Sequence, residues 1–240
     1  MMERITQLDV PSGRTYDISD LQLIMLMNKY GFIAQRDEPF TLKSGIKSRV
    51  YVMGRNDVTD NPILGWYLGR KIARVIIENS LPTDKPPCLI GIPTAGNAIA
   101  AATSLVAFVA GHSASAGPIS YRVMRETVKA HGSGTAEWVN GKYDDQHTFW
   151  AVDNVITDCG TKIEAKDKLI SSGYPALEMP WLIAVDRQQG GIKRMQEHDF
   201  KRIVVAYYLL DISYAMGELG EWPKEVAASV EEEIKAHQFI

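Results

Sequence analysis

Residues 149–162, FWAVDNVITDCGTK, combine an acidic side chain, hydroxyls and small residues in a spacing that suits phosphate binding. The apolar run predicts a strand that ends at Asp153, and after a short polar loop a helix is predicted to begin near Thr161. The unpaired N–H groups at a helix N-terminus attract anions, so a phosphate could bind the loop amides and the hydroxyls of Thr157 and Thr161. Asp153, at the strand end, could bind ribose hydroxyls. A plain strand-to-helix turn capped by Thr161 or Asp158 explains the pattern equally well.

Basic residues in three other segments could bind an anion or a carboxylate. Lys43 lies in the turn of FTLKSGIKS, and Lys129 and His131 stand two apart in the polar loop RETVKAHGSG. Such cations could bind a leaving group, and His131 could donate a proton near neutral pH. Arg187 follows an apolar strand in VDRQQGG, where its planar fork could pair with a carboxylate or a carbonyl edge. The alternatives are an exposed turn lysine, solvated loop charges and, for Arg187, a surface ion pair with Asp186.

The segment GIPTAGNA, residues 91–98, is a second place where a strand leads directly into a helix. Its backbone amides could surround a diphosphate for the same electrostatic reason. Considered without the other motifs, it is also compatible with an ordinary Gly/Ala turn.

The composition bounds the class of protein. The chain has 240 residues, with 26 Lys and Arg against 29 Asp and Glu, a formal net charge of −3, 45% hydrophobic residues and 23% charged residues. This predicts one large α/β domain, with room for a small appendage. A mildly acidic chain lacks the broad positive field of a nucleic-acid binder, so nucleic acid is not an expected partner. Cys88 and Cys159 are too few for a disulfide framework, which fits a reducing compartment.

The sequence also bears on location. The N-terminus, MMERITQLDVPSG, has no apolar stretch of the kind that a signal peptide needs. The most apolar segment, residues 99–110, is Ala-rich and falls short of the roughly 20 apolar residues of a membrane span. We therefore expect a cytoplasmic protein without a membrane segment.

Alternating apolar runs and helical stretches predict a largely parallel sheet that is buried by helices on both faces. The strand-sized runs are residues 88–92, 119–124, 148–152, 181–185 and 203–208. Helical stretches lie near residues 97–110, 161–172 and 190–197. Before them, the sequence predicts a helix opened by Ser19 and Asp20 and ended by Gly31, β-prone pieces within 40–55, and a helix that starts at Asn61-Pro62.

The chain divides into three parts on this pattern. Residues 1–17 are predicted to be a loosely structured extension, residues 18–216 the main domain, and residues 217–240 a helical tail that packs rather than takes part in chemistry. Residues 125–146 are polar and punctuated by glycine. A loop of this length in a compact domain is usually functional or disordered.

The four motifs stand in an order that resembles the type I phosphoribosyltransferases and, among them, the orotate phosphoribosyltransferase branch. Residues 149–162 resemble the ribose-phosphate signature, in which two acidic residues, a branched pair, Thr and a small Gly-rich loop bind phosphoribosyl pyrophosphate (PRPP). FTLKSGIKS resembles the N-terminal lysine motif, RETVKAHGSG the mobile catalytic loop, and VDRQQGG the orotate-side motif. The resemblance runs from about Ile18 to Met216. It implies a mainly parallel central sheet flanked by helices, with a small N-terminal hood over the base.

The resemblance also implies a reaction and its residues. The reaction is the Mg²⁺-dependent transfer of the ribose 5-phosphate group of PRPP to orotate, which gives orotidine 5′-phosphate and pyrophosphate in pyrimidine (UMP) biosynthesis. A homodimer is implied, with the mobile loop reaching the neighbouring site, and Mg²⁺ would be carried by PRPP near Asp153 rather than by direct protein ligands. The implied catalytic residues are Lys129, His131, Arg125 and Lys43. The implied PRPP-binding residues are Asp153, Asn154, Thr157, Asp158, Cys159, Gly160, Thr161, Thr94 and Ala95. The implied orotate-binding residues are Lys43, Phe40 and Arg187.

Four positions depart from the family pattern. Asn154 stands at the second acidic position, where it can hydrogen-bond ribose hydroxyls but carries no charge. Asp158 and Cys159 replace residues that are usually small and uncharged or glycine, so a carboxylate lies near the expected phosphate. Glu126 follows Arg125 where the family often has lysine. Two alternatives stay open: a non-catalytic or regulatory descendant that binds PRPP or a nucleotide, and a phosphoribosyltransferase for another base.

Overall fold

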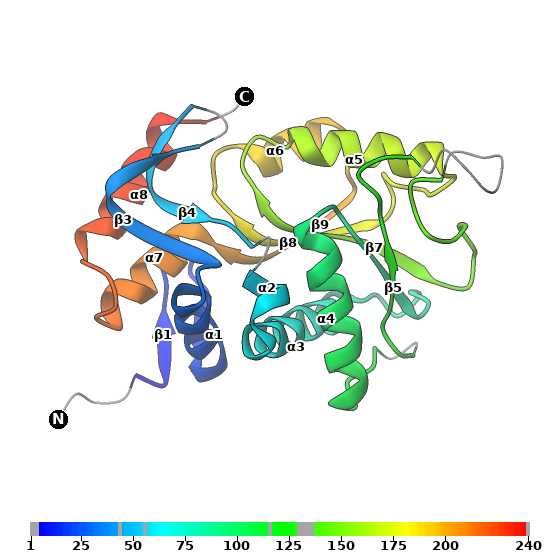
Figure 1. Cartoon of the computed structure of the whole chain (residues 1–240), viewed down its shortest axis with the longest axis horizontal. Helices are drawn as coiled ribbons and strands as arrows, with labels where there is room; N and C mark the ends of the chain where they lie inside the picture. The colour runs from blue at the N-terminus through cyan, green and yellow to red at the C-terminus, as the bar shows by residue number, and fades with distance from the viewer. Residues whose placement is uncertain (1–4, 43–44, 55–56, 115–116, 129–136, 239–240) are drawn as a thin grey trace.

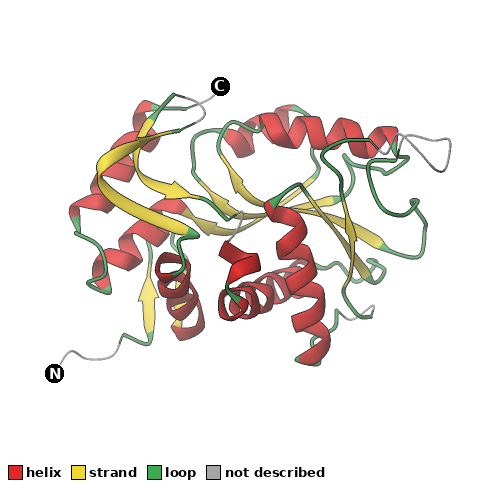
Figure 2. Cartoon of the chain, viewed as in Figure 1, coloured by secondary structure: helices red, strands yellow, loops and turns green. Residues whose placement is uncertain are grey.

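A five-stranded parallel sheet forms the centre of the molecule (Figures 1 and 2). The structure, a computed structural model of the chain, describes residues 5–42, 45–54, 57–114, 117–128 and 137–238. The strands are β5 (Pro87–Gly91), β6 (Ser120–Val123), β7 (Thr148–Ile156), β8 (Pro180–Asp186) and β9 (Arg202–Tyr208). They lie in the order β6-β5-β7-β8-β9, and every neighbouring pair is parallel. The predicted parallel α/β fold and its five strands are confirmed.

Strand β7 extends further than the sequence predicted. The expected end at Asp153 is wrong, because the strand continues to Ile156. The reason is pairing with β8: Val155 and Ile156 lie opposite Val185 and Asp186. The polar loop therefore starts beyond a continuous strand, and Asp153 lies within the sheet rather than at its end.

Helices cover both faces of the sheet (Figure 1). The helices α3 (Pro62–Asn79) and α4 (Ala95–Val109) lie on one face, and α5 (Gly160–Ser171) and α6 (Gly191–Glu197) lie on the other. Together with α1 (Ile18–Lys29), these agree with the predicted helices. The sequence analysis did not predict α2 (Asp57–Asp60) or α7 (Leu209–Glu218). Within the described ranges, none of the helices has the length and apolar character that crossing a membrane would need.

Alternate residues of each strand face two separate cores. In β7, Trp150 and Val152 pack with α3 and α4, whereas Phe149 and Ala151 pack with α5 and α6. All four side chains are buried. This burial on both faces is why the strands read as nearly continuous apolar runs in the sequence.

A small antiparallel hairpin stands over the carboxyl ends of the sheet, where the family resemblance implied a hood. It consists of β3 (Ile33–Thr41) and β4 (Lys47–Val52), and we call this hairpin the hood. The C-terminal helix α8 (Glu225–Ala236) packs against β4 and α7 (Figure 1). The helical tail is therefore joined to the hood and covers the same end of the molecule.

The N-terminal segment is part of the folded domain. The expectation of a loose extension over residues 1–17 is wrong for the part that the structure describes. There, β1 (Gln7–Asp9) and β2 (Thr15–Asp17) form an antiparallel pair. Ser12 donates hydrogen bonds from its amide and hydroxyl to Asp211 of α7, and Tyr16 is 2% exposed. These contacts span almost the whole chain, so local sequence could not reveal them.

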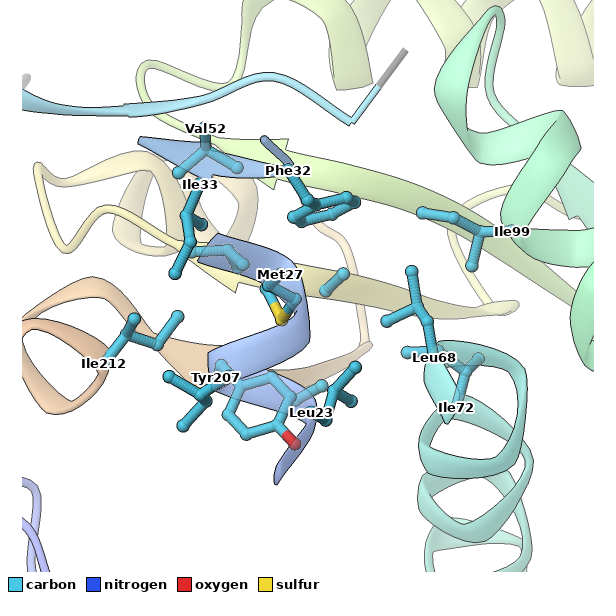
Figure 3. Close-up of a cluster of buried hydrophobic side chains, with 14 of the residues drawn as sticks. Leu23, Met27, Phe32, Ile33, Val52, Leu68, Ile72, Ile99, Tyr207 and Ile212 are labelled. Carbon is cyan, nitrogen blue, oxygen red and sulfur yellow. The ribbon is translucent and has the colours of Figure 1, made fainter. Parts of the chain in front are cut away.

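Helix α1 lies in the middle of the larger core (Figure 3). Met27 lies with Ile212 of α7 on one side and Leu68 of α3 on the other. Asp20 is also buried on this helix, where its Oδ1 forms an ion pair with Lys71 Nζ at 2.6 Å. A buried carboxylate is tolerated there because a cation compensates it.

The start of α4 approaches β7 so closely that only glycine fits at position 96. A Cβ added to Gly96 would lie 2.2 Å from the carbonyl oxygen of Val152, and neither backbone can move easily. We predict that Gly96→Ala lowers the free energy of unfolding by about 1–3 kcal/mol. The matched control is Gly65→Ala in α3, whose added Cβ would lie 3.4 Å from its nearest neighbour. Urea unfolding measures both, and equal stabilities of the two variants would contradict the prediction.

Candidate functional site

A polar crevice of about 360 Å³ lies at the carboxyl ends of β7 and β8, beneath the hood. Its floor includes residues 157–161 and Lys162, and Arg187 lines it as well. Leu42 and Tyr51 contribute from the hood side. Ligand crevices of open α/β sheets lie at this edge, because loops that follow parallel strands meet there.

A second crevice, of about 250 Å³, shares Tyr51 and Lys162 with the first. It adds residues 93–95, Asp153 and Asn154. The two crevices therefore form two parts of one site. Every residue predicted to bind PRPP lines one part or the other: Asp153, Asn154, Thr157, Asp158, Cys159, Gly160, Thr161, Thr94 and Ala95.

The loop before α5 presents a helix N-terminus, but one of its amides already has an anionic partner. The Asp158 carboxylate accepts a hydrogen bond from the Gly160 amide at 3.2 Å. Cys159 holds a left-handed backbone conformation, with φ of +71°, which a glycine would adopt more easily. Burial raises the pKa of the Cys159 thiol to about 11, so the thiol is neutral at physiological pH. A phosphate at this helix end would compete with the Asp158 carboxylate for the amide.

Lys162 is the functional candidate that the sequence analysis missed. Its ammonium lies 2.5 Å from Asp153 Oδ2 and also donates to the Val155 carbonyl oxygen. Both charged side chains are buried, at 5% and 7% exposure. A signal was present: Lys162 stands on the buried stripe of α5 with Ala165 and Leu169, where an apolar residue would be expected.

Hydrogen bonds tie the second crevice to the hood and to the start of the polar loop. The Asn154 amide donates to the Met53 carbonyl oxygen at 2.7 Å, and this contact joins β7 to the end of β4. The Thr94 hydroxyl donates to the carboxylate of Glu126. Asn154 is therefore used as a donor, a role that an aspartate could not fill.

Arg187 is almost fully enclosed, at 2% exposure. Its Nη1 donates to the Val50 carbonyl oxygen at 3.0 Å, and its Nη2 donates to Ser48 Oγ at 2.9 Å and to Glu233 Oε1 at 2.6 Å. Burial lowers the pKa of Arg187, and the adjacent Glu233 carboxylate opposes that shift. The alternative of a surface ion pair with Asp186 is wrong, because the partner is a buried carboxylate from α8.

The other predicted residues fall into two groups. Phe40 lies on β3 and packs against Tyr51, with ring centroids 5.3 Å apart, so it supports a residue that lines both crevices. Arg125 is half-buried, and its amide donates to the Trp138 carbonyl oxygen at 2.8 Å. Three predicted catalytic residues lie outside the described residues: Lys43, Lys129 and His131.

The site offers few ligands for a metal ion. In the described part of the chain, no group of three or more His, Cys, Asp or Glu side chains could hold one. Asp153, the expected neighbour of Mg²⁺, is already paired with Lys162, and Asn154 contributes no charge. The donor set could therefore contact the shell of a metal that arrives on a ligand, but it does not form a separate metal cage.

Comparison with known proteins agrees with the geometry. No family model matches the sequence. An orotate phosphoribosyltransferase from Halobacterium salinarum is 30% identical over 130 residues, which cover 53% of this chain and 66%, just under two thirds, of that enzyme. The orotate phosphoribosyltransferase structure from Francisella tularensis superimposes with a TM-score of 0.68 at 18% identity, covering 93% of this chain and 98% of the other. UMP synthase from Leishmania donovani gives a TM-score of 0.70 at 19% identity over 90% of this chain, which spans 42% of that longer protein.

A parallel sheet with an antiparallel hood over a polar crevice at its carboxyl edge defines a type I phosphoribosyltransferase fold. The sequence of the chain is in turn similar to that of an orotate phosphoribosyltransferase, over 66% of the length of that enzyme.

The buried Lys162–Asp153 pair yields a stability prediction. Lys162→Met leaves the Asp153 carboxylate buried without its cation, and we expect a loss of about 3–5 kcal/mol in the free energy of unfolding. Adding Asp153→Asn to the same chain should recover most of that loss. Lys166→Met is the control, because Lys166 pairs with the exposed Asp167 and should cost less than about 1 kcal/mol. Urea unfolding of the four proteins would contradict the prediction if the double variant were the least stable.

Asp186 predicts a pH dependence. Burial raises its pKa to about 6, whereas the pKa of an aspartate in an unfolded chain is about 3.9. Between these values the folded state binds more protons than the unfolded state, so the contribution of Asp186 to stability is lost as the pH rises through this window. Asp186→Asn keeps an oxygen that can accept from the Gln188 amide and removes the titration. We expect the variant to match the parent near pH 4 and to be on the order of 1–3 kcal/mol more stable at pH 7. A stability difference that does not change with pH would contradict this.

Proposed function

We propose that this chain transfers the ribose 5-phosphate group of PRPP to orotate, giving orotidine 5′-phosphate and pyrophosphate in pyrimidine (UMP) biosynthesis. The observation that carries the proposal is that residues which the family resemblance assigns to PRPP, and one which it assigns to orotate, line one site. The nine expected PRPP residues and Arg187, an expected orotate residue, line adjoining crevices beneath the hood. Similarity to an archaeal orotate phosphoribosyltransferase supports the choice of base.

The geometry supports a division of labour along the site. The amides at the start of α5 would bind the 5-phosphate, with Thr157 and Thr161 as hydroxyl donors. Asp153 and Asn154 would meet the ribose hydroxyls at the adjoining crevice, and the turn at residues 93–95 would meet the pyrophosphate.

The reaction then requires charged groups at the departing pyrophosphate and near the base. As the bond from the sugar carbon to pyrophosphate breaks, that carbon gains oxocarbenium character and the pyrophosphate takes the electron pair. A ring nitrogen of the base, which gives up its N–H proton to solvent, forms the new bond to the sugar carbon. Arg125, Lys129 and His131 would stabilise the departing pyrophosphate, with His131 able to give it a proton, and Lys43 would act near the base. Catalysis on this proposal rests on positioning and electrostatic stabilisation rather than on a covalent intermediate with the protein.

Mg²⁺, a second copy of the chain and a cytoplasmic location complete the proposal. Mg²⁺ would arrive with PRPP near Asp153 and reduce the negative charge of the pyrophosphate. A homodimer would let the segment that contains Lys129 and His131 act at the neighbouring site. The two cysteines are free thiols in the structure, which supports a reducing compartment.

The first test is a turnover assay. Orotate loses ultraviolet absorbance as it is converted, so purified protein is mixed with orotate, PRPP and Mg²⁺ and the absorbance is followed. We expect turnover by the parent chain and a fall of about 10²–10³-fold in kcat for Lys129→Ala, because a cation that is proposed to stabilise the leaving group is lost. Circular dichroism checks that the variant is folded. An undiminished rate would remove Lys129 from the mechanism, and no turnover by the parent chain at high concentration would reject the proposed activity.

A binding-only descendant of the family is the second candidate. It is favoured by two internal carboxylates at the site: Asp158 on the Gly160 amide and Glu126 on the Thr94 hydroxyl. Both compete with an anionic substrate. Calorimetry distinguishes the candidates, because PRPP binding without turnover on a panel of bases favours this reading, whereas turnover with a base other than orotate favours a different base specificity.

A further inference from the structure

The C-terminal helix α8 carries a carboxylate on its buried face. Val226, Val230 and Glu233 are its three buried residues, and they recur at the spacing of one helix stripe. The first two are fully buried apolar side chains that fit a packing role. Glu233 instead brings a charge into the molecule, and this needs a specific partner.

That partner is Arg187, at the base end of the first crevice. Glu233 Oε1 accepts hydrogen bonds from Arg187 Nη2 at 2.6 Å and from Gln189 Nε2 at 2.7 Å. The Arg187 and Glu233 side chains are 3% and 7% exposed. Neither charge could be buried alone without a large loss of solvation, so each holds the other in place.

The hood holds the same guanidinium from another side. Arg187 donates to the Val50 carbonyl oxygen and to Ser48 Oγ, both on β4. Together with the bond to Glu233, three of its five N–H groups are used. The Arg187 Nε is buried, and within the described ranges it has no hydrogen-bond partner. An unpaired buried donor costs free energy, so the Nε–H, like the second N–H of Nη1, is left to donate to a further partner.

We propose that Glu233 is the positioning residue for Arg187, and that α8 thereby belongs to the base-binding end of the site. This inference rests on the proposed function, in which the base lies against Arg187. Glu233 and β4 fix the plane of the guanidinium, and the Nε–H remains to donate to a carbonyl oxygen of a planar base. Since Arg187 and Glu233 form a neutral pair, Arg187 selects its ligand by the direction of a hydrogen bond more than by net charge.

The test is a kinetic series at position 233 with orotate and PRPP. Glu233→Ala removes the contact, and we expect the KM for orotate to rise about tenfold or more while the KM for PRPP stays within about twofold. Glu233→Gln keeps the length and an accepting oxygen but leaves the Arg187 charge buried without its carboxylate, so it should recover only part of the orotate affinity. Glu232→Ala is the matched control, because Glu232 is exposed on the same helix, and it should behave as the parent chain.

Folding and substrate choice are checked separately. PRPP binding by calorimetry shows whether the alanine variant is folded. If it is not, Glu233→Asp decides, since this variant keeps the charge but moves the carboxylate by one methylene and should still raise the KM for orotate. An unchanged KM for orotate in a folded variant, or a fall in that KM, overturns the inference; a fall would mean that Glu233 competes with the base for Arg187.

The same series separates this inference from the proposed function. If the parent chain turns over another base but not orotate, the proposed function fails, and the variants measured with that base still decide the role of Glu233. If the parent chain neither turns over nor binds any base tested, both are rejected.

Discussion

The ion pair between Arg187 and Glu233 joins three parts of the chain: the end of β8, the hood strand β4 and the C-terminal helix α8. Each part has its own reason to fold, since β8 is buried on both faces and α8 packs against α7. The position of these parts relative to one another depends on Arg187, because hydrogen bonds to one planar guanidinium have fixed directions. The hood, the sheet and the tail are thus held in one arrangement at the place where the base would bind. A lysine at position 187 could not make the same set of directed contacts.

The phosphate end depends on internal compensation of charge as well. Asp153 is paired with Lys162, the Asp158 carboxylate accepts from the Gly160 amide, and Glu126 accepts from Thr94. Each of these three carboxylates therefore has a partner within the protein. An anion that binds at this edge must displace the Asp158 or Glu126 carboxylate from its hydrogen-bond donor. Its binding free energy is therefore the difference between the new hydrogen bonds and those that are broken, not the sum of its own contacts.

The sequence predicted the sheet well because double burial leaves an unmistakable pattern. The five strands are short apolar runs between helical stretches, and the carboxyl ends of parallel strands bring their loops together without any further information. The family resemblance assigned Thr94 and Thr157, far apart in sequence, to one site, and they line adjoining crevices because they follow neighbouring parallel strands. The N-terminal hairpin was missed because its stabilising contacts are with α7, about 200 residues away. Glu233 was missed for the same reason, since a buried acidic residue on a helix looks like a solvated one until its partner is known.

Lys162 changes the meaning of the neutral Asn154. In the sequence, asparagine at the second acidic position reads as the loss of a charge that could balance developing positive charge at the sugar. In the structure, Lys162 adds a buried cation beside Asp153, so the formal charges of the Asp153, Asn154 and Lys162 side chains add up to zero. Two carboxylates without the lysine would carry a formal charge of −2. A pair of carboxylates would repel PRPP unless a metal ion or another cation stood between them. With the lysine in place, the ribose end no longer opposes an anionic ligand. The Asn154 amide is free of that electrostatic task, and it instead ties β7 to the hood through the Met53 carbonyl oxygen. Asn154 and Lys162 are therefore coupled through charge: the buried lysine makes a second carboxylate dispensable for balance, and the amide gains a structural contact that a carboxylate could not make.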